Sequence, residues 1–343
     1  MYKGAPYSCE KRDLYQNAPA RRMHKLWPAR VFDAYACELS FRDRPLNFRQ
    51  KVDLCQGTQQ GPIMARGHHY PAFIFRFPAF IRLVHAWNDL LLQRNLIMHR
   101  TLRDSMRTFK GQRVADLGFG EGQHLFRLAK RYPQWHFVGI DTDADHIAFA
   151  TQYAEQSNLP NLKVEQHDFG KAPLSIPLDL VYLVGVLHII PNEQQFLRHL
   201  HASMSEGAEL LLYQPVNNHI YLSFYNTVLK HFPSYDALQG RQRIYTEARL
   251  TALLVSEGFS IVQTDKYVGA VGAIGNELYM GPVSVLLYAQ TTYLRILAAV
   301  LMAITLPLAL LLKWTGHLLP VVRANAVLIQ ARRVAAKTIE NNN

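Results

Sequence analysis

The chain has 343 residues, of which 49% are hydrophobic and 18% are charged. This length is sufficient for a large buried core, and this composition excludes an intrinsically disordered chain. The formal net charge of +11 lies entirely in the first third, because residues 1–112 hold 19 Lys and Arg against 8 Asp and Glu, whereas residues 113–343 hold 18 of each. A basic segment attached to a neutral domain indicates either an anionic partner or a solvated, soluble surface.

The cysteines are Cys9, Cys37 and Cys55. Their number is odd and no pair has C-x-x-C spacing, so we expect neither a disulfide framework nor a metal site. The first residues also lack the apolar stretch of a secretory signal. These features together predict a protein of the reducing cytoplasm.

Three regions follow one another along the chain. We expect a basic N-terminal extension over residues 1–109, a main domain over residues 110–334, and a short tail over residues 335–343. Apolar residues between positions 77 and 109 recur at three- and four-residue spacing, which predicts that the extension ends in a long helix.

Strand-like and helix-like segments alternate in the main domain. The expected strands are 113–119, 136–141, 162–168, 178–187, 208–215, 260–266 and 325–332, and the expected helices are 122–132, 143–157, 192–204 and 246–256. This alternation predicts an α/β domain with a doubly wound, mostly parallel sheet.

A hydrophobic insertion, residues 267–324, precedes the last expected strand. Residues 278–312 carry a single charge, Arg295. The uncharged run is at the lower limit for a membrane span, but one crossing would place the last strand on the wrong side of the bilayer. The insertion is therefore expected either to attach to the cytoplasmic face of a membrane, as a re-entrant or interfacial segment, or to form a soluble lid or dimer contact.

The strongest motif is Asp116-Leu-Gly118-Phe-Gly120-Glu-Gly122, which follows one expected strand and opens a helix. Glycines let the backbone turn sharply and approach a ligand, and the free N–H groups of the helix point at the turn. The dinucleotide motif G-x-G-x-x-G would need glycine at position 123, where Gln123 stands. A pyrophosphate would also be repelled by Asp116.

This D-x-G-x-G-x-G pattern resembles the first motif of the class I S-adenosylmethionine-dependent methyltransferases, and the segment from Leu178 to His188 resembles the fourth-strand motif. The resemblance implies S-adenosylmethionine as cofactor and a seven-stranded sheet, to which this chain adds the expected helical N-terminal extension and a hydrophobic helical insertion before the last strand. The cofactor-binding residues that it implies are Asp116, Gly118, Gly120, Gly122, Asp141, Thr142, Asp168, Phe169, Val184 and Gly185.

Within that resemblance each acid has an expected role. Asp116 suits the methionine ammonium, Asp141 the two ribose hydroxyls, and Asp168 the adenine amino group, with Phe169 packing on the ring or donating its backbone N–H. A carboxylate matches a pair of hydroxyls well, because it has two acceptor oxygens. His188 follows the fourth strand and is the candidate catalytic base for an acceptor that must lose a proton.

Residues 217–245 are rich in aromatic side chains and follow the fifth expected strand. They form either part of an acceptor pocket or a helix that packs on the core. Together with the apolar insertion they favour a small hydrophobic acceptor, such as a lipid, polyketide, polyene or quinone-like molecule. Nucleic acid is the less favoured partner, because no RNA-binding module is visible. The alternatives are an RNA methyltransferase using the basic extension and a non-catalytic S-adenosylmethionine-binding protein.

Overall fold

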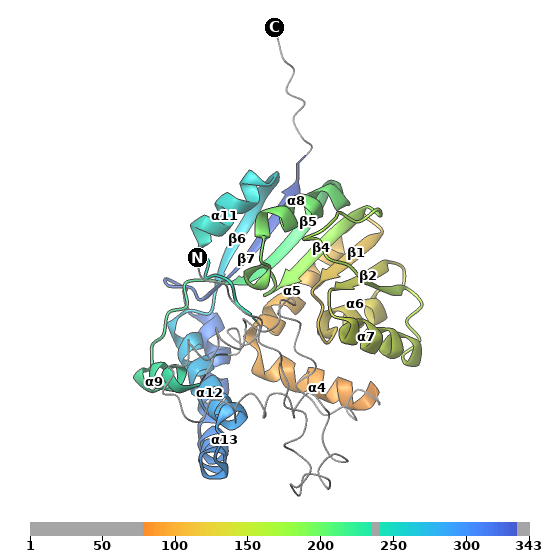
Figure 1. Cartoon of the computed structure of the whole chain (residues 1–343). Helices are drawn as coiled ribbons and strands as arrows, with labels where there is room; N and C mark the ends of the chain where they lie inside the picture. The colour runs from red at the N-terminus through yellow and green to blue at the C-terminus, as the bar shows by residue number, and fades with distance from the viewer. Residues whose placement is uncertain (1–77, 233, 235–239, 335–343) are drawn as a thin grey trace, which may run out of the picture. The chain divides into compact units, whose positions relative to one another are not determined.

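The computed structural model describes residues 78–232, 234 and 240–334 (Figure 1). All of these residues belong to one compact unit, residues 64–343. The predictions for residues 1–77, which include the cysteines and most of the basic extension, and for the tail lie outside the described residues.

Seven strands form a single sheet. They are β1 (Arg113–Leu117), β2 (His136–Asp141), β3 (Leu162–Gln166), β4 (Leu178–Val184), β5 (Met204–Pro215), β6 (Phe259–Tyr267) and β7 (Ala326–Arg333). Their order is β3-β2-β1-β4-β5-β7-β6, and only β7 runs antiparallel to its neighbours. The predicted α/β, mostly parallel, seven-stranded sheet is confirmed.

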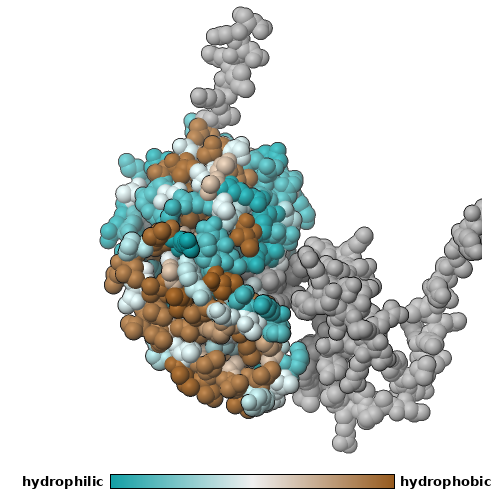
Figure 2. Space-filling view, turned by 90° about the vertical axis from the view of Figure 1, so that its left-hand side faces the viewer, coloured by the Kyte–Doolittle hydropathy of each residue, from teal (hydrophilic) through white to brown (hydrophobic). Residues whose placement is uncertain are grey.

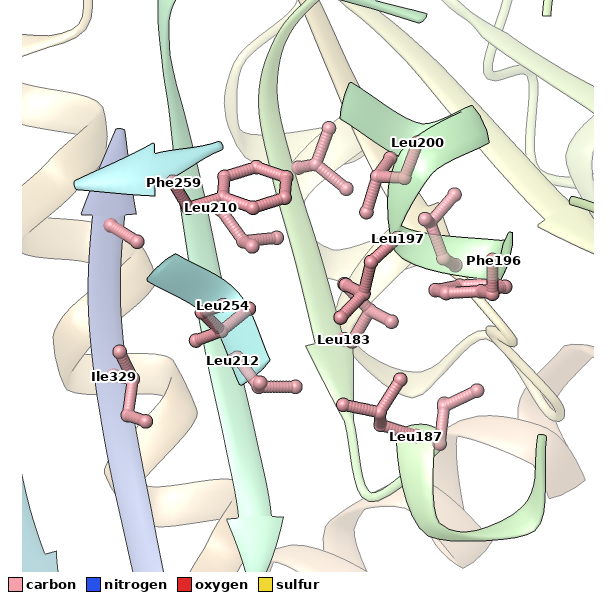
Figure 3. Packing of buried hydrophobic residues seen from close by; sticks show 14 of the residues in the cluster. Leu183, Leu187, Phe196, Leu197, Leu200, Leu210, Leu212, Leu254, Phe259 and Ile329 are labelled. Atoms are coloured by element: carbon pink, nitrogen blue, oxygen red, sulfur yellow. The ribbon is translucent and has the colours of Figure 1, made fainter. Parts of the chain in front are cut away.

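Helices cover both faces of the sheet (Figure 1). One face packs against α5 (Gln93–Thr108), α6 (Gln123–Arg131) and α7 (Ala144–Gln156), and the other against α8 (Glu193–Ser203) and α11 (Glu247–Ser256). Side chains alternate along a strand, so successive residues of β4 point to opposite faces of the sheet. Because helices cover both faces, the buried part of this central strand is apolar throughout. Figure 3 shows the core on the face covered by α8 and α11, where leucines of β4, β5, α8 and α11 pack against one another.

Polar residues begin three helices where the sequence places them. The side chains of Asp143, Asn192 and Thr246 accept hydrogen bonds from the backbone N–H two or three residues later. Such caps satisfy amide groups that the first helical turn leaves without an intrahelical partner. The helix starts are therefore fixed locally, and they agree with the expected boundaries within one residue.

The N-terminal helical segment differs from its prediction. Two helices, α4 (Pro78–Leu91) and α5, replace the single expected helix, because Leu92 adopts an extended conformation between them. The break lies within an apolar Leu-Leu-Leu run, where no glycine or proline in the sequence marks it.

The hydrophobic insertion forms an antiparallel pair of helices, α12 (Ala270–Tyr288) and α13 (Thr292–Thr315), packed against each other. At Gly275 the two backbones are so close that a Cβ atom would lie 2.7 Å from the carbonyl oxygen of Ala309. By length and composition both helices could cross a membrane. Figure 2 shows hydrophobic residues gathered over this part of the surface, whereas the surface over the sheet is mostly hydrophilic.

A further helix, α9 (Ser223–His231), lies in the aromatic segment and packs against α12. The carboxylate of Glu277, in α12, accepts hydrogen bonds from the backbone N–H of Tyr221 (2.9 Å) and Leu222 (2.7 Å). This buried carboxylate fixes α12 to the chain that leads into α9.

Candidate functional site

The glycine motif forms a turn between β1 and α6 that only glycine tolerates without strain. Gly118, Gly120 and Gly122 have φ angles of +68°, +55° and +68°. A Cβ atom at Gly118 would lie 2.7 Å from Val186, and one at Gly122 would lie 2.5 Å from the Phe126 ring, whereas one at Gly120 would meet no atom within 4 Å. The turn is therefore packed at both ends and open at its middle glycine, where a ligand can approach the backbone.

Asp141 stands at the end of β2, directly beside this opening. Its Oδ2 accepts a hydrogen bond from the backbone N–H of Gly120 (3.0 Å) and lies 3.2 Å from Nδ1 of His146, and its Oδ1 accepts from the N–H of Asp143 (3.0 Å). Burial alone would raise the pKa of Asp141, but these hydrogen bonds and the charge of His146 lower it overall. The carboxylate is thus ionised, fixed in orientation, and joined to the glycine turn.

Two neighbours shape the charge around Asp141. Burial lowers the pKa of His146, yet the hydrogen bond and charge of Asp141 outweigh burial and raise it overall. Burial raises the pKa of Glu121, within the glycine turn, to about 7, although the charges of His146 and Arg94 oppose this rise. The site therefore combines a fixed carboxylate with a histidine whose pKa is raised and a carboxyl group, Glu121, whose pKa is about 7.

Asp116 lies in β1, two residues before the turn, in register with Tyr182 of β4. It is buried, and burial raises its pKa well above the usual range; the Tyr182 hydroxyl opposes the rise and the charge of Asp141 adds to it. A carboxyl group in such surroundings would gain its charge when a cation binds beside it. The structure thus places Asp116 beneath the turn rather than at its surface.

Asp168 lies two residues beyond the end of β3, not at the strand end as expected. Its Oδ1 accepts from the N–H of Gly170 (2.8 Å), and its Oδ2 lies 3.4 Å from Nζ of Lys171. The adjoining backbone N–H of His167 donates to the carbonyl oxygen of Asp141 (3.1 Å), so the ends of β2 and β3 are held together. Asp116, Asp141 and Asp168 therefore all lie near the carboxyl ends of neighbouring strands, β1, β2 and β3.

The remaining residues implied by the resemblance have mixed surroundings. The Phe169 ring is buried and packs against Phe196, with ring centroids 5.7 Å apart, so it forms part of the core. Thr142 is exposed beside Asp141. Val184 ends β4, and Gly185 follows with a φ of +67°. They lie at the carboxyl end of the central strand, where ligands of open α/β sheets bind.

His188 is buried in a short 3₁₀ turn after β4. The side-chain amide of Gln214 donates to its Nδ1 at 2.8 Å, which leaves the proton of the neutral ring on Nε2. Proton abstraction by Nε2 would require the opposite orientation of this amide, in which Oε1 accepts from Nδ1. The base role of His188 stays a prediction.

Helix α4 contributes contacts to the glycine turn that the sequence did not reveal. Burial lowers the pKa of His85 to about 4, so its ring is neutral, and Nε2 lies 3.1 Å from the carbonyl oxygen of Glu121, to which it donates. The Gln123 side chain donates to the carbonyl oxygen of His85 (3.1 Å) and also to Asp89, which pairs with Arg127. These partners are more than 30 residues apart, and no local pattern marks them.

The chain is similar to known proteins over this part of its length. Residues 108–265 match a family model described as a methyltransferase domain. The chain is 32% identical to a trans-aconitate 2-methyltransferase of Deinococcus radiodurans over 149 residues, which are 41% of this chain and 55% of that protein. It is 26% identical to a probable (S)-tetrahydroprotoberberine N-methyltransferase 2 of Papaver bracteatum over 102 residues, which are 30% of this chain and 28% of that protein.

One solved structure similar to this chain is an O-methyltransferase from a trans-AT polyketide synthase multienzyme of Brevibacillus brevis, in complex with S-adenosyl-L-homocysteine. It is 17% identical, covers 72% of this chain and 79% of its own, and has a TM-score of 0.46. The chain spans about half or less of the length of the curated relatives named above.

Proposed function

Because residues 108–265 belong to the family of class I S-adenosylmethionine-dependent methyltransferases, we propose that this protein transfers a methyl group from S-adenosylmethionine to a small hydrophobic acceptor. The observation that carries the proposal is the opening at Gly120 beside the ionised carboxylate of Asp141. The acceptor belongs to the class of lipids, polyketides, polyenes or quinone-like molecules.

The residues at the sheet edge suit this cofactor. Asp141 offers acceptor oxygens to a pair of ribose hydroxyls: Oδ1 has a lone pair beyond its bond from Asp143, and Oδ2 would accept a hydroxyl in place of its contact with His146. Asp116 lies where a methionine ammonium would favour its ionised form. The cofactor supplies an activated methyl group on a sulfonium, so the protein contributes chiefly by holding the two reactants in line.

Apolar surface supports a hydrophobic acceptor. Helix α13 exposes large apolar side chains along one face, among them Ile296, Val300, Ile304, Leu308 and Leu311. Monomeric soluble proteins rarely expose apolar patches of this extent unless the patch binds something. An acceptor that dissolves in lipid could be reached from such a face without crossing water.

The same hairpin supports attachment to the cytoplasmic face of a membrane. Its two ends continue into β6 and β7. Tyr267, the last residue of β6, pairs with Ala326, the first residue of β7, so both ends of the hairpin leave the sheet side by side. Glu277 is held by the backbone before α9, and only about 11 residues, or ~16 Å of helix, separate it from the tip at Tyr288. This reach is about half of a ~30 Å hydrocarbon core, which favours entry into one leaflet over a crossing.

The proposal is tested by following a labelled methyl group. The purified protein is incubated with methyl-labelled S-adenosylmethionine and a lysate of its own cells, which is then separated into organic-soluble, small aqueous and RNA fractions. We expect label in the organic fraction, and at least about tenfold less label with the Asp141→Asn variant at subsaturating cofactor. Label confined to RNA would replace this proposal with the RNA methyltransferase alternative, and binding of the cofactor without label in any fraction would indicate a non-catalytic binding protein.

A further inference from the structure

Helix α4 has an outward face that the proposed function does not use. Four large apolar side chains follow one another at three- and four-residue spacing on that face: Phe80, Leu83, Trp87 and Leu90. Leu83 is 66% exposed and Trp87 is 53% exposed. A helix that buried its apolar face against the protein would show the opposite pattern.

The exposed face of α4 adjoins that of α13. Leu90 and Trp314 line the same small cavity, and both are partly exposed. The ammonium of Lys313 is buried there, donates to the carbonyl oxygen of Leu91 at 2.8 Å, and lies 4.6 Å from the centre of the Tyr279 ring. The side-chain amide of Gln93 donates to the carbonyl oxygen of Lys313 at 2.7 Å. The hairpin is therefore fastened to the end of α4 and the start of α5, where the chain breaks at Leu92.

The inward face of α4 holds the glycine turn. Its His85 binds the backbone of Glu121, and its Asp89 binds both Gln123 and Arg127 of α6. A single helix thus contacts the exposed apolar surface on one side and the turn that would hold the cofactor on the other.

We propose that α4 and α13 together form a docking surface for an anionic lipid bilayer, and that α4 couples docking to cofactor binding at the glycine turn. This inference rests on the proposed function, because it concerns the same cofactor site. It adds α4 to the membrane surface and predicts that the two binding events influence each other.

The charges favour an anionic bilayer over a second copy of this chain. In α4, in the hairpin and in the chain up to β7, the exposed charged side chains are Arg82, Arg295 and Arg323, whereas Glu277 is buried and Asp89 is half-buried. Cations beside an apolar face suit acidic headgroups, while two copies of such a face would oppose like charges. Trp87 and Trp314 supply the aromatic side chains that are enriched at membrane interfaces.

Coupling between two sites is reciprocal. If docking strengthens cofactor binding by some factor, the cofactor must strengthen docking by the same factor, and couplings between sites are typically about 5- to 150-fold. The experiment therefore measures both directions on the full chain. S-Adenosylhomocysteine affinity is determined by calorimetry with and without vesicles of phosphatidylglycerol and phosphatidylcholine, and vesicle affinity is determined with and without S-adenosylhomocysteine.

We expect both affinities to rise by the same factor, at least about fivefold, and the rise to vanish with vesicles of phosphatidylcholine alone. Binding of S-adenosylhomocysteine that ignores the vesicles would overturn the inference and leave the proposed function intact. Failure to bind S-adenosylhomocysteine under either condition would overturn both. Self-association without vesicles, seen by light scattering, together with no vesicle binding would assign the surface to a second copy and also overturn the inference.

Two sets of variants separate the surface from the coupling. Leu83→Ser with Trp87→Ser should weaken vesicle binding at least tenfold and leave S-adenosylhomocysteine affinity without vesicles unchanged. The matched control is Val255→Ser, which removes an exposed apolar side chain from α11 and should leave both affinities unchanged. Equal vesicle affinity in the double variant and the control would contradict the docking surface.

Asp89→Asn weakens the link between α4 and α6. It should leave vesicle affinity in the absence of S-adenosylhomocysteine unchanged. Vesicles should then no longer strengthen S-adenosylhomocysteine binding, and S-adenosylhomocysteine should no longer strengthen vesicle binding. Arg127→Gln removes the other partner of this pair and should have the same effect, which guards against a variant that folds poorly. Unchanged enhancement in both variants would contradict coupling through α4.

Discussion

The glycine turn offers a comparison at the scale of single residues. Gly118 and Gly120 both have positive φ angles, so alanine at either position costs about 1–2 kcal/mol of backbone strain. Only at Gly118 would the new methyl group also collide, with Val186 at 2.7 Å. Gly118→Ala should therefore lower the free energy of unfolding by about 1–3 kcal/mol more than Gly120→Ala does, as measured by urea denaturation.

Gly120→Ala should have the larger relative effect on ligand binding. Its methyl group would occupy the open space beside Asp141. Gly120→Ala should therefore bind S-adenosylhomocysteine at least about tenfold more weakly than wild type, beyond any loss caused by backbone strain. Wild-type affinity in a folded Gly120→Ala variant would show that no ligand approaches the turn at this glycine.

The pair formed by His146 and Asp141 predicts a pH dependence of stability. The pKa of His146 is raised in the folded protein, so the stability that it contributes is fully present below the unfolded pKa of about 6.5 and is lost as the pH rises through the folded value. Wild type should therefore exceed His146→Gln in free energy of unfolding more at pH 6 than at pH 8.5. A difference that grows with pH would contradict this assignment.

Sequence alone predicts the site residues that belong to strand ends and turns. The glycine spacing and the acids near the ends of β1, β2 and β3 are local patterns, and the sheet brings them to one edge. The depth of Asp116, the burial of Phe169 and the contact of His85 with Glu121 depend on tertiary packing, and no spacing in the sequence encodes them.

At the scale of elements, the hairpin of α12 and α13 provides the sharpest test. In a helix, alanine is normally more favourable than glycine by about 1 kcal/mol. At Gly275 the added Cβ would meet a backbone oxygen of α13 at 2.7 Å, so Gly275→Ala should instead destabilise the protein by about 1–3 kcal/mol.

Gly272→Ala is the matched control for this prediction. Its Cβ would meet the end of the flexible Gln93 side chain, which can move aside by giving up its hydrogen bond to Lys313, so Gly272→Ala should destabilise the protein less than Gly275→Ala does. Denaturation of both variants in the same detergent-free buffer compares them. If Gly275→Ala were as stable as Gly272→Ala, the close contact between the two helices would be wrong.

Sequence periodicity predicts the elements better than their connections. Caps at Asp143, Asn192 and Thr246 mark helix starts locally, whereas the break at Leu92 stands in a uniform apolar run. The fifth strand also begins earlier than expected, at Met204, which pairs with Leu178 before a shift in register, and its first residues lack an alternating buried pattern.

At the scale of the whole molecule, topology explains why the insertion stays near the domain. The hairpin leaves from β6 and returns to β7, and these strands are neighbours in one sheet. The sequence predicts this return from the apolar strand at residues 325–332. The insertion folds as two paired helices, each of which shields part of the other.

Affinity for S-adenosylhomocysteine in Asp141→Asn, measured by calorimetry, tests the central claim most directly. The substitution removes the charge and one acceptor oxygen beside the glycine turn, so we expect binding about 10- to 100-fold weaker than wild type. Asp179→Asn is the control, because Asp179 also accepts two backbone N–H bonds, from Gln112 and Arg113, but at the opposite end of the sheet, and it should bind as wild type does. A folded Asp141→Asn variant that binds as tightly as the control would contradict a cofactor site between the glycine turn and the end of β2.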